Sequence, residues 1–135
     1  MKKKLLNGFL MIACVMCMSV TAFAASSTSF KVNNVSVTGS ISYTDTSEYN
    51  PLGKDSVTAK TSATSSMDSI DASATIYYAT GSTLKTATES NSNKNSTSCS
   101  VTANASTTGT GYRGTGSHNA SHNGKSGSGT TAVAW

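Results

Sequence analysis

Along most of the chain after residue 24, apolar and polar residues alternate one by one. The clearest case is the segment 35–43, in which Val, Ile and Tyr residues alternate with Ser and Thr. A period of two places successive side chains on opposite faces of an extended chain, which is typical of a half-buried β-strand. No segment of 25–135 has apolar residues spaced three and four apart over several turns, so we predict no helix there.

The same alternation recurs in four further segments, and a shorter apolar run at 30–32 precedes the first strand. These segments are 57–63, 70–78, 83–89 and 97–105. Polar stretches at 45–53 and 90–95 are expected to be loops, and Gly81-Ser82 a turn. Together with a C-terminal hairpin, this pattern predicts about six to seven strands. Short strands joined by polar turns are typical of a small antiparallel β-sandwich or flattened barrel.

The C-terminal segment contains Asn123-Gly124, a strong signal for a two-residue hairpin turn because both positions accept positive φ. A type I′ turn here makes the residue numbers of facing partners sum to 247. Tyr112 then meets Trp135 as a cross-strand aromatic pair, and Trp135 anchors the C-terminus in the core. Glycines thin the middle of this hairpin, which either weakens it or lets another backbone approach closely. They are Gly114, Gly116, Gly127 and Gly129.

The first 24 residues have the three-part layout of a secretory signal peptide. Residues 2–4 are lysines, 5–20 are largely apolar, and Ala22-Phe23-Ala24 supplies small residues for cleavage. The apolar stretch is short for a membrane-spanning helix. We therefore expect a bacterial protein that is secreted or attached to the cell envelope, with 25–135 as a single Ser/Thr-rich β domain. An uncleaved anchor and a lipoprotein built on Cys14 are the less favoured alternatives.

The expected domain is unusually rich in hydroxyl side chains, with Ser and Thr making up 44 of 111 residues. Leu, Ile, Val and Phe number only 12, a fraction that usually indicates disorder. The regular alternation and a net charge of +1 oppose that interpretation. So small a charge gives no reason to expect nucleic acid or an anionic membrane as a partner. A thin core predicts modest stability, which self-association or attachment to a surface would supplement.

Few side chains are suited to catalysis or metal binding. Cys99 is the one cysteine after residue 24, and we interpret it as a small buried hydrophobe rather than a free or intermolecularly bonded thiol. His118 and His122 lie four residues apart on a predicted strand, about 13 Å from each other, too far to share a metal ion. We expect both imidazoles to face solvent near the hairpin tip, with a binding role as the alternative. No cofactor is expected.

Catalysis is not expected either, because no G-x-S-x-G motif occurs and no acid lies near either histidine in sequence. Asp68 and Asp71 are compatible with a carboxylate pair or a weak calcium site, but we interpret them as solubilising residues beside a turn. The stretch 109–114 lacks the spacing of a phosphate-binding loop. A secreted hydrolase is therefore the least favoured function.

The tyrosines suggest a surface for stacking sugars. Alternation places Tyr43, Tyr78 and Tyr112 on apolar faces, so Tyr49 and Tyr77 are the better surface candidates. The candidate binding surface predicted from the sequence is Tyr49, Tyr77, Arg113, His118 and His122.

These observations favour a non-catalytic extracellular or cell-envelope module that binds or assembles. Its expected partners are a second copy, joined by strand addition, or a cell-wall or glycan surface. The alternative is a bacteriocin-like, membrane-active β-hairpin toxin, and only in that case is a membrane the partner.

Overall fold

The computed structural model describes residues 26–46, 53–106 and 108–135, and its regular elements there are all β-strands. They are β1 (Ser27–Val32), β2 (Val35–Thr44), β3 (Ser56–Thr80), β4 (Thr83–Asn104), β5 (Thr110–His122) and β6 (Lys125–Ala134). In one antiparallel sheet, β1, β2, β3, β5 and β6 follow one another, and β4 pairs with β3. The predicted all-β class is confirmed. None of these residues forms a helix long and apolar enough to cross a membrane.

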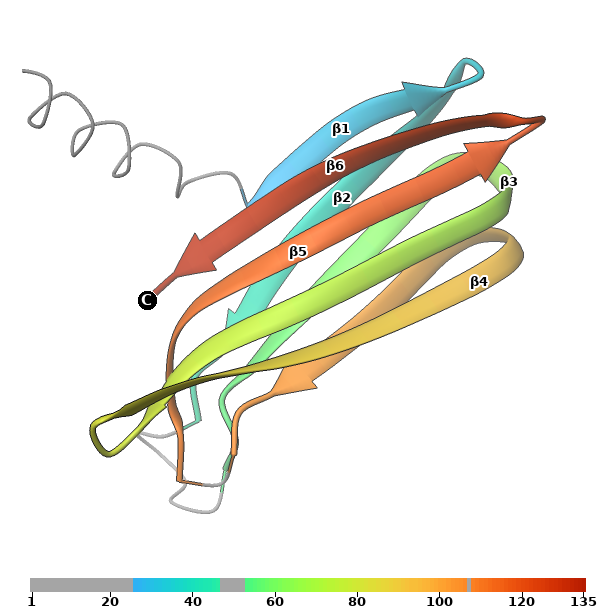
Figure 1. Ribbon diagram of the computed structural model, residues 1–135. Coiled ribbons are helices and arrows are strands. Elements are labelled where there is room, and N and C mark those ends of the chain that lie inside the picture. Colours follow the sequence, from blue (N-terminus) through green and yellow to red (C-terminus); the bar gives the residue numbers. More distant parts are fainter. Residues whose placement is uncertain (1–25, 47–52, 107) are drawn as a thin grey trace, which may run out of the picture.

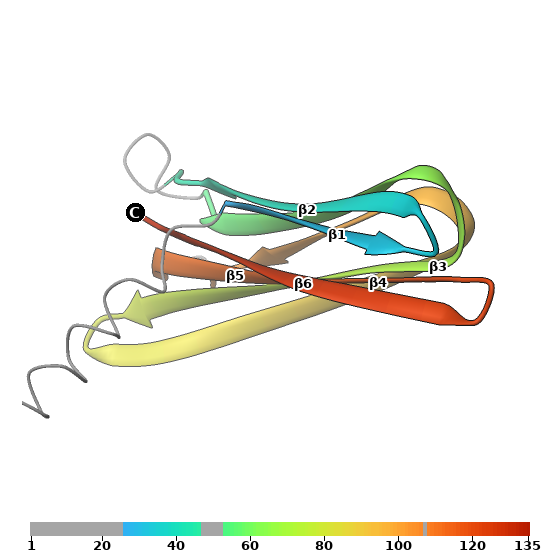
Figure 2. The same ribbon diagram turned by 90° about the horizontal axis from the view of Figure 1, so that it is seen from above.

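Strand β3 takes part in two layers because it is long and bends in the middle (Figures 1 and 2). Its residues 56–62 pair with β2 on one side and with 98–104 of β4 on the other. Its residues 69–79 pair with β5 and with the first part of β4. The sheet therefore folds over on itself. We call β1, β2, 56–62 and 98–104 the first layer, and 69–80, 83–96, β5 and β6 the second layer.

The bend is a large irregularity between β3 and β4. Between Ser62 and Met67, the residues 63–66 of β3 oppose the single residue Thr97 of β4. Extra residues on one strand bend it and increase its twist. The prediction of separate strands at 57–63 and 70–78 is therefore wrong, since both belong to β3.

The segment 90–95, predicted to be a loop, is also part of a strand. It continues β4, which pairs only with β3 and forms the edge of the second layer. Five of its six residues are exposed, so no inward face selects apolar side chains. Polar composition on an edge strand exposed on both faces is indistinguishable from that of a loop.

The edges of the two layers approach each other on both sides, so the molecule is a nearly closed, flattened barrel. On one side, the side-chain amides of Asn91 and Asn93 donate to the carbonyls of Ser100 and Ser98, at 3.1 and 2.8 Å. On the other side, β1 packs against β6. Gly127 of β6 lies so close to β1 that a Cβ there would be 2.8 Å from the Phe30 ring. The glycines of this hairpin thus let side chains approach closely, rather than another backbone as predicted.

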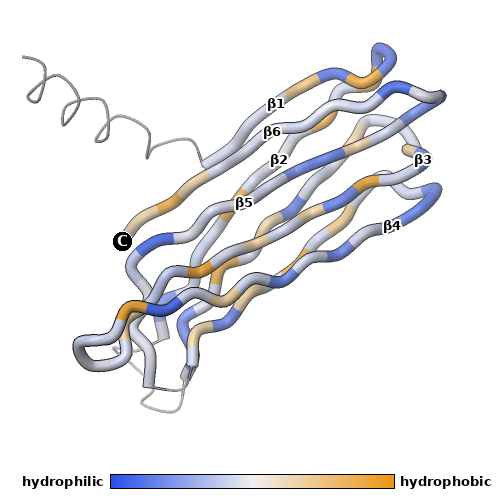
Figure 3. The backbone as a smooth tube through the Cα atoms, viewed as in Figure 1, coloured by the Kyte–Doolittle hydropathy of each residue, from blue (hydrophilic) through white to orange (hydrophobic). Residues whose placement is uncertain are grey.

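The core between the layers is thin and built from small side chains. Six of the buried hydrophobic residues are alanines, beside a few Val and Ile. Most of the chain is pale in Figure 3 because Ser, Thr, Ala and Gly have intermediate hydropathy. Cys99 is buried in this core, as expected, and burial raises the pKa of its thiol.

The C-terminal hairpin has the predicted register. Asn123 and Gly124 have φ values of 49° and 73°, and His122 faces Lys125 while Arg113 faces Ala134. The partner numbers thus sum to 247. A turn of this kind fixes the register of both strands, because a slip by one residue would exchange their two faces.

The predicted pairing of Tyr112 with Trp135 is wrong at the level of the side chains. A register shift between β3 and β5 falls at Tyr112, which becomes the extra residue of a bulge and is 39% exposed. Trp135 stacks instead on Tyr43, with ring centroids 4.4 Å apart and 3° between the planes. Trp135 packs against the core, as predicted, while Tyr43 itself remains 44% exposed. Of the three tyrosines predicted on apolar faces, only Tyr78 is buried.

Candidate functional site

The structure brings together two of the five predicted surface residues. Tyr77 of β3 and Arg113 of β5 are cross-strand partners, and both are partly exposed on the outer face of the second layer. The guanidinium carbon of Arg113 lies 5.1 Å from the centroid of the Tyr77 ring, a cation–π contact. Tyr49 lies outside the described residues. The two histidines are not part of this pair.

His118 is completely buried between the layers, so the prediction that it faces solvent is wrong. Its Nδ1 lies 2.9 Å from the Thr61 hydroxyl, and its Nε2 lies 2.8 Å from the Thr131 hydroxyl. Room for the ring comes from Gly39 of β2, where a Cβ would be only 2.3 Å from the imidazole Cγ. The sequence feature that allows His118 to be buried is therefore a glycine far away in the chain, Gly39.

The hydrogen bonds assign the protonation of His118. The Thr61 hydroxyl donates to the carbonyl of Asp71 at 2.7 Å, so its oxygen accepts from Nδ1–H of His118. In the neutral ring, Nε2 then accepts from Thr131. Burial lowers the pKa of His118, which favours this neutral form. A hydroxyl–imidazole pair also occurs in nucleophilic catalysis, but here Thr61 and Thr131 are 0% and 3% exposed, so substrates do not reach them.

His122 lies at the tip of the C-terminal hairpin, beside Asp68, which follows the bend in β3. Its Nδ1 is 3.5 Å from one Asp68 carboxylate oxygen, and the other carboxylate oxygen accepts from the backbone N–H of Asn123 at 2.8 Å. Asp68 therefore fixes the hairpin turn against the bend. Asp71 accepts instead from Ser69 and Ser92, so the two carboxylates have different partners. Within the described segments, no group of three or more His, Cys, Asp or Glu side chains is placed to hold a metal ion.

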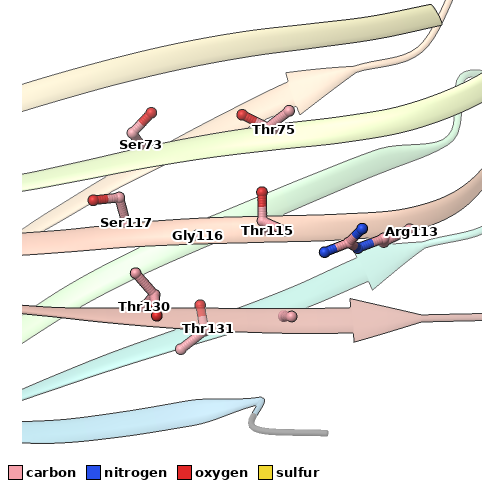
Figure 4. A pocket seen from close by; sticks show the side chains of 9 residues that line it. Ser73, Thr75, Arg113, Thr115, Gly116, Ser117, Thr130 and Thr131 are labelled. Carbon is pink, nitrogen blue, oxygen red and sulfur yellow. The ribbon is translucent and has the colours of Figure 1, made fainter. Parts of the chain in front are cut away.

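A depression of the described surface lies on the outer face of the second layer, beside Arg113. It has a volume of about 400 Å³ and is lined mainly by small side chains from β3, β5 and β6. We call the five outward hydroxyls in it the hydroxyl platform. They belong to Ser73, Thr75, Thr115, Ser117 and Thr130, and Arg113 lies at one end of the row (Figure 4).

Strand alternation and register place these hydroxyls side by side. In the platform, the outward Ser and Thr residues of β3 and β5 alternate with buried Ala, Ile, Gly and His residues. Across the strands, Thr75 pairs with Thr115, while Ser73 pairs with Ser117, which pairs with Thr130. Directly opposed residues in neighbouring strands are about 5 Å apart, so the hydroxyls form a regular array. Because Ser and Thr are short, the array forms a shallow hollow rather than a ridge.

The hydroxyls of the platform differ in their partners. Those of Ser73 and Thr75 bond to Ser90 and Thr88 on β4, at 2.9 and 2.8 Å. Among the described residues, those of Thr115, Ser117 and Thr130 have no side-chain hydrogen bond to protein. The polar hollow continues along the strands toward Asp71 and Asn119, where two further shallow depressions lie.

One buried carboxylate was missed by sequence reasoning. Asp55, only 1% exposed, accepts from the backbone N–H of Thr46 at 3.0 Å and from that of Gly111 at 2.7 Å. Its own carbonyl accepts from the N–H of Ala105. Asp55 thus connects three segments at one end of the barrel. Its place directly before a predicted strand was the available signal, but its partners come from distant parts of the chain.

Comparison with protein-family models, with curated proteins and with solved structures finds no match. The platform and the pair of Tyr77 and Arg113 are therefore interpreted from their own geometry.

Proposed function

We propose that this chain is an exported, non-catalytic module that binds a glycan along the hydroxyl platform. The observation that carries this proposal is the regular array of outward hydroxyls in one shallow hollow, three of them without a protein partner. The pair of Tyr77 and Arg113 borders the array at one end. The partner we propose is a polysaccharide of the cell wall or of the surroundings.

The chemistry of the array suits sugars. Each Ser or Thr hydroxyl both donates and accepts, as each sugar hydroxyl does, so the two sets can pair in many ways. A single hydrogen bond contributes only about 0.5–1.5 kcal/mol net, because water competes for both partners. Useful affinity therefore requires many such contacts in a row. A long, shallow hollow supplies them to an extended polymer better than to a single sugar.

Export is part of the proposal and rests on the pattern of the first 24 residues. We expect the protein collected outside cells to begin at Ala25, which intact-mass measurement checks. A mass that retains residues 1–24 would contradict cleavage and favour an anchored form.

Affinity electrophoresis through gels that contain polysaccharides tests the binding function. The panel includes neutral and acidic polymers and a solubilised cell-wall fraction. We expect retardation by at least one polymer, and a loss of at least roughly tenfold in affinity for Thr115→Ala/Ser117→Ala/Thr130→Ala, which removes three hydrogen-bonding groups.

The matched control is Thr58→Ala/Thr102→Ala. These two hydroxyls bond to each other at 2.7 Å on the outer face of the first layer. The control should bind like the unaltered protein. Equal losses in both variants, or no retardation by any polymer, would contradict the proposal. Release of dye from cells or lipid vesicles by the protein would instead support the membrane-active toxin.

A further inference from the structure

We infer that two copies of this chain form a two-fold symmetric dimer through the free edge of β4, with residues 84–90 of both copies paired as antiparallel strands. The partner at this edge is therefore a second copy of the same protein. The inference goes beyond glycan binding and does not depend on it. Three features of β4 carry it: an open backbone edge, a regular strand and the placement of two charges.

The first support is the open backbone edge of 83–90. This stretch of β4 pairs with β3 on one side, and β4 contacts no other strand of the described part of the chain. Figure 1 shows the stretch at the outer edge of the second layer. Farther along, the Asn91 and Asn93 side chains cover the edge by bonding to the other part of β4. Every second residue of an edge strand turns its N–H and C=O away from its neighbour, so 83–90 offers these groups to a further strand.

The second support is the regularity of this edge. The register between β4 and β3 is unbroken from Thr83 to Lys94, so no bulge twists the strand away. The stretch 83–90 contains no proline, and all of its side chains are exposed except that of Ala87, which is partly buried. Proteins commonly protect an edge strand by a bulge, a proline or charged side chains. Of these three, the edge of β4 has only charges.

The third support is the placement of those charges, which are of opposite sign. Lys85 and Glu89 lie two residues before and two residues after Ala87, and the period of two places all three on the same face. When two copies pair antiparallel with Ala87 opposite Ala87, Lys85 of one copy faces Glu89 of the other, and symmetry repeats this pair. Opposite charges directly across two strands are stabilising, and like charges are destabilising. The charges therefore favour self-pairing in this register.

The same register also suits the outer face of the joined sheet. Thr86 of one copy faces Thr88 of the other, a favourable cross-strand pair. Moving the two-fold axis from Ala87 to either threonine would break both ion pairs. Because directly opposed residues point to the same face, both hydroxyl platforms would lie on one side of the joined sheet. The pairing occupies the same edge in both copies, so assembly stops at the dimer.

Sedimentation velocity of the protein over a range of concentrations tests the inference. We expect a monomer–dimer equilibrium without larger species. Lys85→Glu and Glu89→Lys each place like charges opposite each other twice, so each should raise the dissociation constant at least roughly tenfold. An equimolar mixture of the two variants should dimerise again, because each copy of one is then complementary to a copy of the other.

Lys94→Glu is the matched control. It makes the same change in charge at an exposed position of the same strand, outside the paired stretch. This variant should dimerise like the unaltered protein.

Disulfide cross-linking tests the register. Ala87→Cys places two thiols at the two-fold axis, where directly opposed Cα atoms are about 4.5–5.5 Å apart, within the range that a disulfide requires. Oxidised glutathione should link this variant into a covalent dimer. The native Cys99 is buried, so the unaltered protein should remain unlinked. Lys94→Cys should also remain unlinked, because its thiol lies outside the paired stretch.

A monomer at every concentration would overturn the inference. So would a dimer that survives in both Lys85→Glu and Glu89→Lys, or a loss that their mixture does not restore. Equal linking of Ala87→Cys and Lys94→Cys, or fibres in place of dimers, would contradict the two-fold pairing.

Discussion

Thr130 and Thr131 are neighbours on β6, yet their hydroxyls have opposite roles. Thr131 points into the barrel, is 3% exposed, and bonds to Nε2 of His118 at 2.8 Å. Thr130 points outward into the hydroxyl platform and is exposed. The same contrast separates Thr61, which is buried and bonded twice, from Thr115 on the outer face.

This contrast teaches that one residue type supports the fold on one face of the sheet and, on the other face, is left available for the binding proposed above. A buried hydroxyl must be bonded, because an unsatisfied polar group in the core is costly. His118 meets this need for two threonines at once and thereby connects the layers. An exposed hydroxyl is satisfied by water and remains available to a ligand. Substitutions inside should therefore change the free energy of unfolding, and substitutions outside should change binding.

The largest expected effect concerns the space that Gly39 leaves for His118. Gly39→Ala places a methyl group inside the imidazole and should lower the free energy of unfolding by about 3 kcal/mol. His118→Ala breaks a buried network and should cost roughly as much. In the double variant the new methyl group fills part of the vacated space, so the combined loss should be smaller than the sum by about 1 kcal/mol or more. Urea denaturation measures all three, and additive losses would contradict the packing described.

The next effect is a dependence of stability on pH. Burial lowers the pKa of His118 below its ordinary value, and the unfolded chain titrates near 6.5. Below that pH the unfolded chain binds more protons than the folded protein. The free energy of unfolding should therefore decrease as the pH is lowered, by at most about 1.4 kcal/mol per pH unit. Above it the contribution of the neutral ring is fully present. Denaturation between pH 5 and 7.5 measures this slope.

The variant His118→Gln cannot titrate and should reduce that slope. An unchanged slope in His118→Gln would show that other groups cause the pH dependence.

A smaller effect separates the two neighbouring threonines. Thr131→Val keeps the shape but removes the donor to His118, so unfolding should become easier by about 1–2 kcal/mol. Thr130→Val should change stability by less than about 0.5 kcal/mol, because surface substitutions rarely do more. Thermal unfolding of both variants checks this difference. Similar losses would mean that the two faces are not distinguished as described.

The smallest effect on stability should come from the platform itself. Thr115→Ala/Ser117→Ala/Thr130→Ala should unfold within about 1 kcal/mol of the unaltered protein, although it loses binding to glycan. Comparison of urea midpoints and binding curves on the same samples checks both. A large loss of stability would mean that these hydroxyls support the fold.

Local signals predicted the elements whose geometry is set within a few residues. Asn123-Gly124 fixes its turn and the register of β5 and β6, because both residues accept positive φ. Alternation likewise predicted the inward and outward faces of β2 and of most of β3. In β5, the bulge at Tyr112 exchanges the inward and outward faces for the residues before it. Nothing in the local sequence marks this bulge.

Features that depend on distant partners could not be predicted. The environment of His118 requires Gly39, Thr61 and Thr131 from three other segments of the chain. Tyr77 and Arg113 were both predicted surface residues, but their contact depends on the register between β3 and β5. The platform was not predicted, because outward Ser and Thr are common to every strand and only the pairing places these five together.

The most direct test of the glycan-binding platform is a map of backbone amide chemical shifts during titration with the polymer that binds. The account predicts that shifts concentrate on β3, β5 and β6 around Thr75, Thr115, Ser117 and Thr130, with Arg113 at one end. Residues on the outer face of the first layer, such as Thr58 and Thr102, should not move. Shifts centred on the first layer, or spread evenly over the molecule, would contradict the platform as the binding surface.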